Sequence, residues 1–155
     1  MGRLKAGEKA PDFALPDAEG KMRRLAEFLG KKLVLYFYPK DDTPGCTVEA
    51  CDFTARQDKI LAAGAAVVGV SPQDGKSHQK FISKYGLKHL LLCDTDHAVA
   101  EKYGVWGKKK FMGREYMGIE RSTFVIDEKG RIRRAMYGVN PAGHADGILE
   151  ILAGK

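Results

Sequence analysis

A cysteine at the start of a predicted helix is the residue of this sequence best placed to do chemistry. Cys46 follows a Pro44-Gly45 turn, so it falls in the first helical turn, and Thr43 lies three residues before it. Backbone N–H groups are unpaired in a first turn, and the positive end of the helix dipole favours an anion such as a thiolate. The position predicts a nucleophilic thiol, with a buried structural cysteine as the alternative. The Thr43 hydroxyl could hydrogen-bond the sulfur or an incoming oxygen atom.

The segments around Cys46 have the pattern of an α/β protein. Residues 33–38 are a continuous apolar and aromatic run that ends at Pro39, as expected of a strand buried on both faces. A helix, a strand and another helix follow, and the chain closes with a hairpin and a final helix. This order predicts a parallel core with an antiparallel edge and helices on both faces. Residues 39–46 would then lie at the carboxyl end of a buried strand, where open α/β sheets place their sites.

The other elements are placed by apolar spacing and by turn residues. Glycines at 64, 86 and 104 mark helix ends, and residues 127–130 are a hairpin turn signal. The stretch between Gly104 and Ser122 is predicted to be a long glycine-rich loop. We expect strands at 33–38, 65–70, 90–92, 122–126 and 132–137, and helices at 46–61, 77–85, 94–103 and 142–152.

Composition and length exclude several classes of protein. The 155 residues are 44% hydrophobic and 30% charged, which is ordinary globular usage, and they fit a single domain over 1–155. No apolar run approaches the ~20 residues that span a bilayer, and no signal peptide is evident. Three cysteines do not make a secreted disulfide framework, so we expect a cytoplasmic protein. The net charge of +6 is spread out, with clusters at 108–110 and 131–134 expected on solvated surface, so neither nucleic acid nor membrane is an expected partner.

The segment that contains Cys46 resembles a known active-site signature. Residues 39–46 match the Pro-x-x-x-Thr-x-x-Cys pattern of the peroxiredoxins, and further matches lie at 7–16, 36–39, 103–107 and 120–127. With the Cys46 to Cys51 spacing, the chain resembles the bacterioferritin comigratory protein or peroxiredoxin Q subfamily. The resemblance implies a thioredoxin-like fold, with a central mixed sheet flanked by helices. It also implies a cofactor-free thiol peroxidase for hydrogen peroxide and organic hydroperoxides, reduced by a thioredoxin-type donor, and a monomer or weak homodimer.

The resemblance assigns roles to the residues of the signature. Cys46 would be the peroxidatic cysteine, and Pro39, Thr43 and Arg121 would complete its pocket. Thiolate attack on a peroxide expels a developing oxyanion, which fixed donors such as the Arg121 guanidinium stabilise. Pro39 would shield the sulfur from water. From the residues alone, Pro39 could simply end a strand and Arg121 could be a surface charge.

The same resemblance makes Cys51 the resolving cysteine of an atypical two-cysteine enzyme. In a regular helix the Cα atoms of Cys46 and Cys51 would be roughly 8–9 Å apart, whereas a disulfide needs about 4.4–6.8 Å. We therefore expect the first helical turn to unwind in each cycle, with Pro44-Gly45 as the hinge. Glu49 matches an acidic position of the pattern and would support the site or lie on a solvated helix face.

The third cysteine lies outside this pattern. Cys93 ends a short buried strand, where a free cysteine behaves as a small hydrophobe. The alternative is a zinc site in which Cys93 and His97 join Cys46 and Cys51, but no paired ligand spacing supports it and we expect no metal. The remaining histidines, at 78, 89 and 144, are expected on the surface.

Two rival functions follow from other interpretations of the cysteines. A protein disulfide oxidoreductase would share the fold but would carry Cys-x-x-Cys at the helix start, whereas Cys46 and Cys51 are five residues apart. A metal-binding or nucleic-acid-binding module would use the cysteines as ligands or the basic residues as its contact surface. Metal analysis and salt-dependent DNA binding would separate that module from an enzyme.

Overall fold

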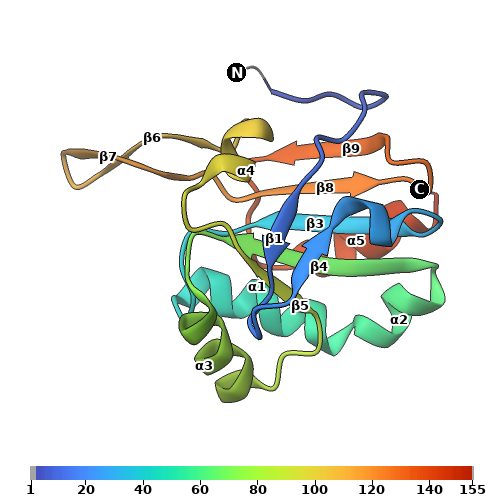
Figure 1. Ribbon diagram of the computed structural model, residues 1–155, viewed down its shortest axis with the longest axis horizontal. Coiled ribbons are helices and arrows are strands. Elements are labelled where there is room, and N and C mark those ends of the chain that lie inside the picture. The colour runs from blue at the N-terminus through green and yellow to red at the C-terminus, as the bar shows by residue number, and fades with distance from the viewer. Residues whose placement is uncertain (1–2, 155) are drawn as a thin grey trace.

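A five-stranded sheet forms the centre of the computed structural model, which describes residues 3–154. Figure 1 shows its strands side by side in the order β5-β4-β3-β8-β9. Strands β3, β4 and β5 are parallel, while β8 pairs antiparallel with both β3 and β9. The predicted parallel core with an antiparallel edge is therefore confirmed. The strands are β3 (Lys32–Phe37), β4 (Ala65–Ser71), β5 (Leu90–Cys93), β8 (Ser122–Ile126) and β9 (Ile132–Tyr137).

The central strand β3 is buried on both faces because its side chains alternate between two cores. Leu33, Leu35 and Phe37 pack in one core. Val34 and Tyr36 pack in the other. Successive side chains of a strand point to opposite faces, so a run without polar residues is what a strand between two layers requires.

Different elements cover the two faces of the sheet. The face of Val34 and Tyr36 packs against α1 (Pro44–Ala55), α2 (Gln57–Ala62), α3 (Gly75–Tyr85) and α5 (His144–Leu152). The other face packs mainly against the amino-terminal segment, with β1 (Ala14–Pro16), β2 (Met22–Arg24) and the short 3-10 helix η1 (Leu25–Phe28), and against α4 (Ala98–Lys102). Helices on both faces are confirmed. The β1–β2 hairpin was not predicted, because three-residue strands carry little periodicity. Within residues 3–154, every helix is too short or too polar to cross a bilayer.

Two sequence predictions of elements were wrong. The helix expected at 46–61 begins at Pro44 and breaks at Arg56, where α1 ends and α2 follows. The loop expected between Gly104 and Ser122 is a hairpin of β6 (Trp106–Phe111) and β7 (Arg114–Ile119). Its two-residue turn is Met112-Gly113, where both residues have positive φ, as the tight turns of hairpins require.

The β6–β7 hairpin extends away from the sheet (Figure 1). Its tip is apolar and solvated, and Met112 is 88% exposed. Three consecutive lysines at 108–110 had concealed the strand in the sequence, because they interrupt the alternation of apolar and polar residues. The lysines at 108 and 110 are exposed as expected, while Lys109 folds back and its ammonium donates to the Ile119 carbonyl at 2.8 Å.

Candidate active site

Cys46 lies in the first turn of α1, directly after the loop that follows β3. Thr43 is the N-cap residue and Pro44 the first helical residue, so Cys46 is the third. The first helical hydrogen bond runs from the Thr47 N–H to the Thr43 carbonyl at 2.8 Å. Within residues 3–154, no protein group accepts the N–H of Gly45 or Cys46. These unpaired donors belong to the first turn that carries Cys46, a residue that is only 1% exposed.

Arg121 brings a second strand of the sheet to the cysteine. It precedes β8, and its Nη2 donates to the Cys46 Sγ at 3.2 Å while Nη1 donates to the Glu49 Oε1 at 2.7 Å. Burial lowers the pKa of Arg121, but the neighbouring Glu49 and Cys46 outweigh burial and leave the pKa above its usual value. The guanidinium is therefore a fixed positive charge that joins the sulfur to a buried carboxyl.

Glu49 is buried beneath this guanidinium rather than on a solvated helix face. Within residues 3–154 its Oε2 has no hydrogen-bond partner, whereas Oε1 accepts from Arg121. Burial raises the pKa of Glu49 to about 7, against the opposing charge and hydrogen bond of Arg121. Of the two interpretations of this residue from the sequence, the supporting one fits the structure.

Gly45 allows the guanidinium to approach the helix start. A Cβ at this position would lie 3.1 Å from Arg121 Nη2 and 3.4 Å from Pro141 Cγ. The 3.1 Å contact is tighter than side chains normally make, so a larger residue would require the Arg121 guanidinium to shift by a few tenths of an ångström. The glycine therefore has a packing role in addition to the hinge role expected from the sequence.

Thr43 is oriented by the loop and not by the sulfur. Its hydroxyl donates to the Lys40 carbonyl at 2.8 Å, so the oxygen keeps its lone pairs free to accept a hydrogen bond. Thr43 and Pro39 line an open groove of about 680 Å³ next to the helix start. The far wall of this groove is supplied by the hairpin, and its main side chains are Trp106, Phe111, Tyr116 and Met117. The groove is a path for an apolar molecule toward the loop.

The other two cysteines lie in different environments. Cys51 is on α1 with Cys46, both thiols are free, and burial together with Asp52 raises the Cys51 pKa. Cys93 is buried at the end of β5, where its thiol lies 3.7 Å from the Asp17 carbonyl and burial raises its pKa to about 11. The hydrogen-bond partner of the Cys93 thiol is Asp17, whereas that of the Cys46 sulfur is Arg121. Among residues 3–154, no three His, Cys, Asp or Glu side chains are arranged to hold a metal ion.

The surface prediction for three histidines was wrong. His78 and His89 are buried, and His144 is half-buried. Each ring has a polar partner that lies far away in the sequence, which is why the sequence alone did not reveal it. His89 pairs with the Tyr36 hydroxyl at 2.7 Å and His144 with the Thr123 hydroxyl at 2.8 Å. Burial lowers the pKa of both rings to about 4.

Comparison with known proteins gives one family. The profile of the AhpC/TSA family matches residues 6–135. A putative peroxiredoxin bcp of Helicobacter pylori strain J99 is 49% identical over 98% of this chain and all of the relative. The peroxiredoxin Bcp of Bacillus subtilis is 46% identical over 96% of this chain and 95% of the relative. A structure of Xanthomonas campestris peroxiredoxin Q has a TM-score of 0.90 at 39% identity, and covers 97% of this chain and 98% of its own.

Proposed function

The chain belongs to the AhpC/TSA family, as a thiol peroxidase of its bacterioferritin comigratory protein or peroxiredoxin Q branch, and from that premise we propose how its residues carry out the reaction. The thioredoxin-like fold expected from the sequence is the fold of this family. One observation supports the proposed site most strongly, which is the Arg121 Nη2 at 3.2 Å from the Cys46 sulfur. We propose that residues 1–155 form one catalytic domain.

In the first step the Cys46 thiolate attacks the terminal oxygen of a hydroperoxide. The O–O bond breaks, an S–O bond forms, and the sulfur is oxidised by two electrons to a sulfenic acid. The leaving oxygen departs as an alkoxide or hydroxide and takes a proton from water. Arg121 Nη2 and the free Cys46 N–H are donors already in place for the charge that develops on that oxygen.

Thr43 and Pro39 prepare the peroxide for this attack. Because the Thr43 hydroxyl donates to the Lys40 carbonyl, its oxygen can accept the O–H of the incoming hydroperoxide. Pro39 contributes an apolar wall beside Thr43, which keeps water away from the reacting atoms. Together they direct the peroxide so that its O–O bond points along the line of attack.

In the second step the Cys51 thiolate attacks the sulfur of the sulfenic acid. An S–S bond forms, the S–O bond breaks, and the hydroxide takes up the proton that the Cys51 thiol lost and leaves as water; a thioredoxin-type dithiol then reduces the disulfide. Both cysteines lie on the uninterrupted helix α1. Its regular geometry keeps their Cα atoms roughly 8–9 Å apart, so the first turn unwinds before the disulfide closes.

The apolar groove favours organic hydroperoxides in addition to hydrogen peroxide. Its hairpin wall is aromatic and its other wall holds Pro39 and Thr43. Alkyl peroxide reduction is the activity ascribed to the bacterioferritin comigratory protein of Xanthomonas campestris, whose structure is 38% identical in sequence to this chain. We propose the same substrate class here, in a cytoplasmic monomer or weak homodimer. The reaction as written balances without a cofactor.

The test is peroxide consumption coupled to thioredoxin, thioredoxin reductase and NADPH. We expect Cys46→Ser to lose turnover by more than ~1000-fold. Cys51→Ser should still consume one equivalent of peroxide at Cys46 but lose turnover with thioredoxin. Cys93→Ser is the matched control and should keep turnover within about twofold, because its buried thiol contacts the Asp17 carbonyl rather than the Cys46 sulfur or Arg121. Equal losses in the Cys46 and Cys93 variants would contradict the proposal.

A further inference from the structure

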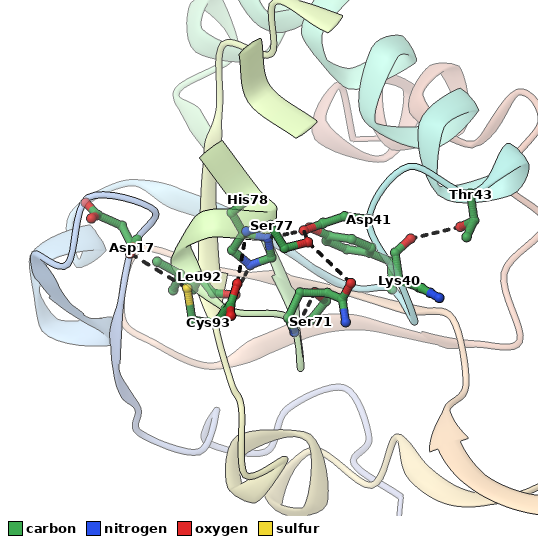
Figure 2. A network of polar contacts seen from close by, with 12 residues as sticks. Asp17, Lys40, Asp41, Thr43, Ser71, Ser77, His78, Leu92 and Cys93 are labelled. Atoms are coloured by element: carbon green, nitrogen blue, oxygen red, sulfur yellow. Dashed lines mark hydrogen bonds and ion pairs between the residues drawn. The ribbon is translucent and has the colours of Figure 1, made fainter. Parts of the chain in front are cut away.

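We propose that Asp41 and His78 form a buried ion pair that positions the Thr43 hydroxyl for the peroxide, acting through the peptide that joins Lys40 to Asp41. The inference rests on the proposed peroxidase function and adds two positioning residues to it. Neither residue is placed to contact the substrate, so both act through Thr43. A network of polar contacts joins α3, β5 and the loop after β3 (Figure 2).

Asp41 is the centre of this network. Its carboxylate accepts hydrogen bonds from the Tyr38 hydroxyl at 2.6 Å, the Ser77 hydroxyl at 2.6 Å and the His78 Nδ1 at 2.7 Å. The residue is buried, and burial alone would raise its pKa. Hydrogen bonds from His78, Ser77 and Tyr38 outweigh burial, so the pKa of Asp41 lies below its usual value. The carboxyl group is therefore ionised.

His78 supplies the opposite charge. Its ring is completely buried, and Nε2 lies 2.9 Å from the Leu92 carbonyl oxygen. A carbonyl oxygen only accepts hydrogen bonds, so Nε2 carries a proton. The ionised Asp41 carboxylate likewise only accepts, so Nδ1 carries a proton too. Each ring nitrogen therefore faces an acceptor, which is the geometry that a doubly protonated ring needs in order to pair with the carboxylate.

The network reaches the active site through one peptide. The carbonyl of Lys40, which is bonded to the nitrogen of Asp41, is the group that accepts the Thr43 hydroxyl at 2.8 Å. In Figure 2 the Ser77 and His78 side chains lie on one side of Asp41 and the Lys40–Thr43 contact on the other. When three buried donors fix the Asp41 side chain, they also fix the carbonyl that orients Thr43.

The neighbouring residue shows that this loop needs external support. Asp42 has a φ of +55°, a left-handed conformation that a non-glycine residue rarely adopts without stabilising contacts. Its carboxylate accepts from the Lys84 ammonium at 2.8 Å and from the Tyr85 hydroxyl at 2.6 Å. Helix α3 thus contacts two consecutive residues of the loop, and the buried contact is the one next to the Lys40 carbonyl.

We expect the Asp41–His78 pair to affect the rate at which Cys46 reacts with peroxides and not the rate at which it reacts with other thiol reagents. A peroxide needs an acceptor for its O–H, which is the role of Thr43, whereas an alkylating agent such as iodoacetamide needs only the thiolate. Asp41→Asn keeps the shape of the side chain but removes its charge. We expect it to lower the second-order rate constant for Cys46 oxidation by roughly tenfold or more. Alkylation of Cys46 should stay within about twofold.

A matched control separates positioning from loss of stability. His89→Asn likewise disrupts a buried polar contact, but the His89 ring contacts Tyr36 and Thr54 instead of the loop. It should lower the midpoint of thermal unfolding and leave the ratio of the peroxide rate to the alkylation rate unchanged. If Asp41→Asn does not fold, Ser77→Ala removes one donor to the same carboxylate and should change the ratio in the same direction.

Two further measurements decide the inference. In a Thr43→Val background, Asp41→Asn should cause no additional loss of peroxide rate, because the group it positions is gone. The ¹⁵N shifts of the His78 ring at neutral pH should show two protonated nitrogens. An unchanged rate ratio, full additivity with Thr43→Val, or a neutral His78 ring would overturn the inference. Those results would leave the peroxidase proposal intact, since that proposal is tested by the Cys46→Ser and Cys93→Ser variants.

Discussion

The two segments that flank the helix start are held very differently. The loop at 39–43 is tied to α3 through Asp41 and Asp42, and the Asp41 contacts are buried. The first turn of α1 has no side-chain hydrogen bond at its N-cap, and its cysteine sulfur is held by Arg121 alone among residues 3–154. The loop can therefore keep its shape when the turn unwinds. In the proposed reaction, the loop orients the peroxide, and the first turn of α1 is free to carry the oxidised sulfur toward Cys51.

The far end of α1 is again firmly anchored. The Phe53 ring stacks on Tyr36 with the centroids 4.9 Å apart, and Thr54 contacts His89. Just beyond the helix, the Arg56 guanidinium makes a two-pronged contact with Asp146 on α5. Unwinding that starts at Pro44 should therefore stop near Phe53. Cys51 lies just before that limit.

The sharpest test of this contrast is hydrogen exchange in the two redox states. When the Cys46–Cys51 disulfide forms, we expect amide protection between residues 45 and 53 to fall by roughly 100-fold or more. Amides of α3 and β3 should keep their protection. Equal protection at 45–53, with the disulfide confirmed by mass spectrometry, would refute the unwinding. An intermolecular disulfide would show that Cys51 resolves across a dimer.

The second prediction concerns Arg121, whose guanidinium donates to the Cys46 sulfur. Arg121→Lys should lower the rate constant of Cys46 oxidation by about 10- to 100-fold, because an ammonium cannot reach both the sulfur and Glu49 with a planar fork. Stopped-flow mixing with hydrogen peroxide measures it. Arg56→Lys, at the anchored end of the helix, is the control and should leave this rate within about twofold. Equal rates in the wild type and Arg121→Lys would remove Arg121 from the site.

A smaller effect on the peroxide rate is expected from substitution of Gly45, which lies against the Arg121 guanidinium. Gly45→Ala places a methyl group 3.1 Å from Arg121 Nη2, so we expect the peroxide rate to fall by several-fold, up to about tenfold. Gly147→Ala is the matched control, because Gly147 is also helical but its Cβ would meet nothing within 4 Å. That control should stabilise the fold by about 0.5–1 kcal/mol without changing the rate. A Gly45→Ala enzyme with wild-type kinetics would contradict the close-approach argument.

The smallest expected effect is a change in how stability depends on pH. Because the pKa of Glu49 is raised to about 7 in the folded protein, the folded state keeps a proton that the unfolded chain loses near pH 4.5. Wild-type stability should therefore fall as pH rises from about 5 to 8. Glu49→Gln removes this dependence. Between pH 5 and pH 8, the free energy of unfolding of the variant should therefore rise by about 1–3 kcal/mol relative to that of the wild type. Urea unfolding at pH 5 and pH 8 measures it, and parallel pH curves would contradict the buried carboxyl.

Much of the fold could be predicted because its core strands are locally distinctive. Residues 33–38 are wholly apolar or aromatic, and β8 and β9 flank a recognisable turn. The β6–β7 hairpin could not be recognised in this way, because its lysines interrupt the alternation and its turn is Met-Gly rather than a typical turn pair. A short strand that packs on little of the core leaves a weak hydrophobic pattern.

The site was predictable only where its geometry is local. The place of Cys46 follows from Pro44-Gly45 and the helix that comes after them, whereas the role of Arg121 came from family resemblance. The Asp41–His78 contact joins residues 37 positions apart, and no short-range pattern encodes it. One signal was available, since His78 is spaced three residues from Phe81 on the buried side of α3.

The exposed β6–β7 hairpin carries methionines that peroxide can oxidise. Met112 is 88% exposed at the tip, and Met117 is 49% exposed in the wall of the groove. We expect hydroperoxide that does not react with Cys46 to oxidise these exposed thioethers to sulfoxides. A sulfoxide at Met117 makes that wall polar and chiral, so damage accumulates first where apolar substrates enter. The lifetime of the enzyme on organic hydroperoxides then depends on methionine sulfoxide repair as well as on the supply of reducing thiols.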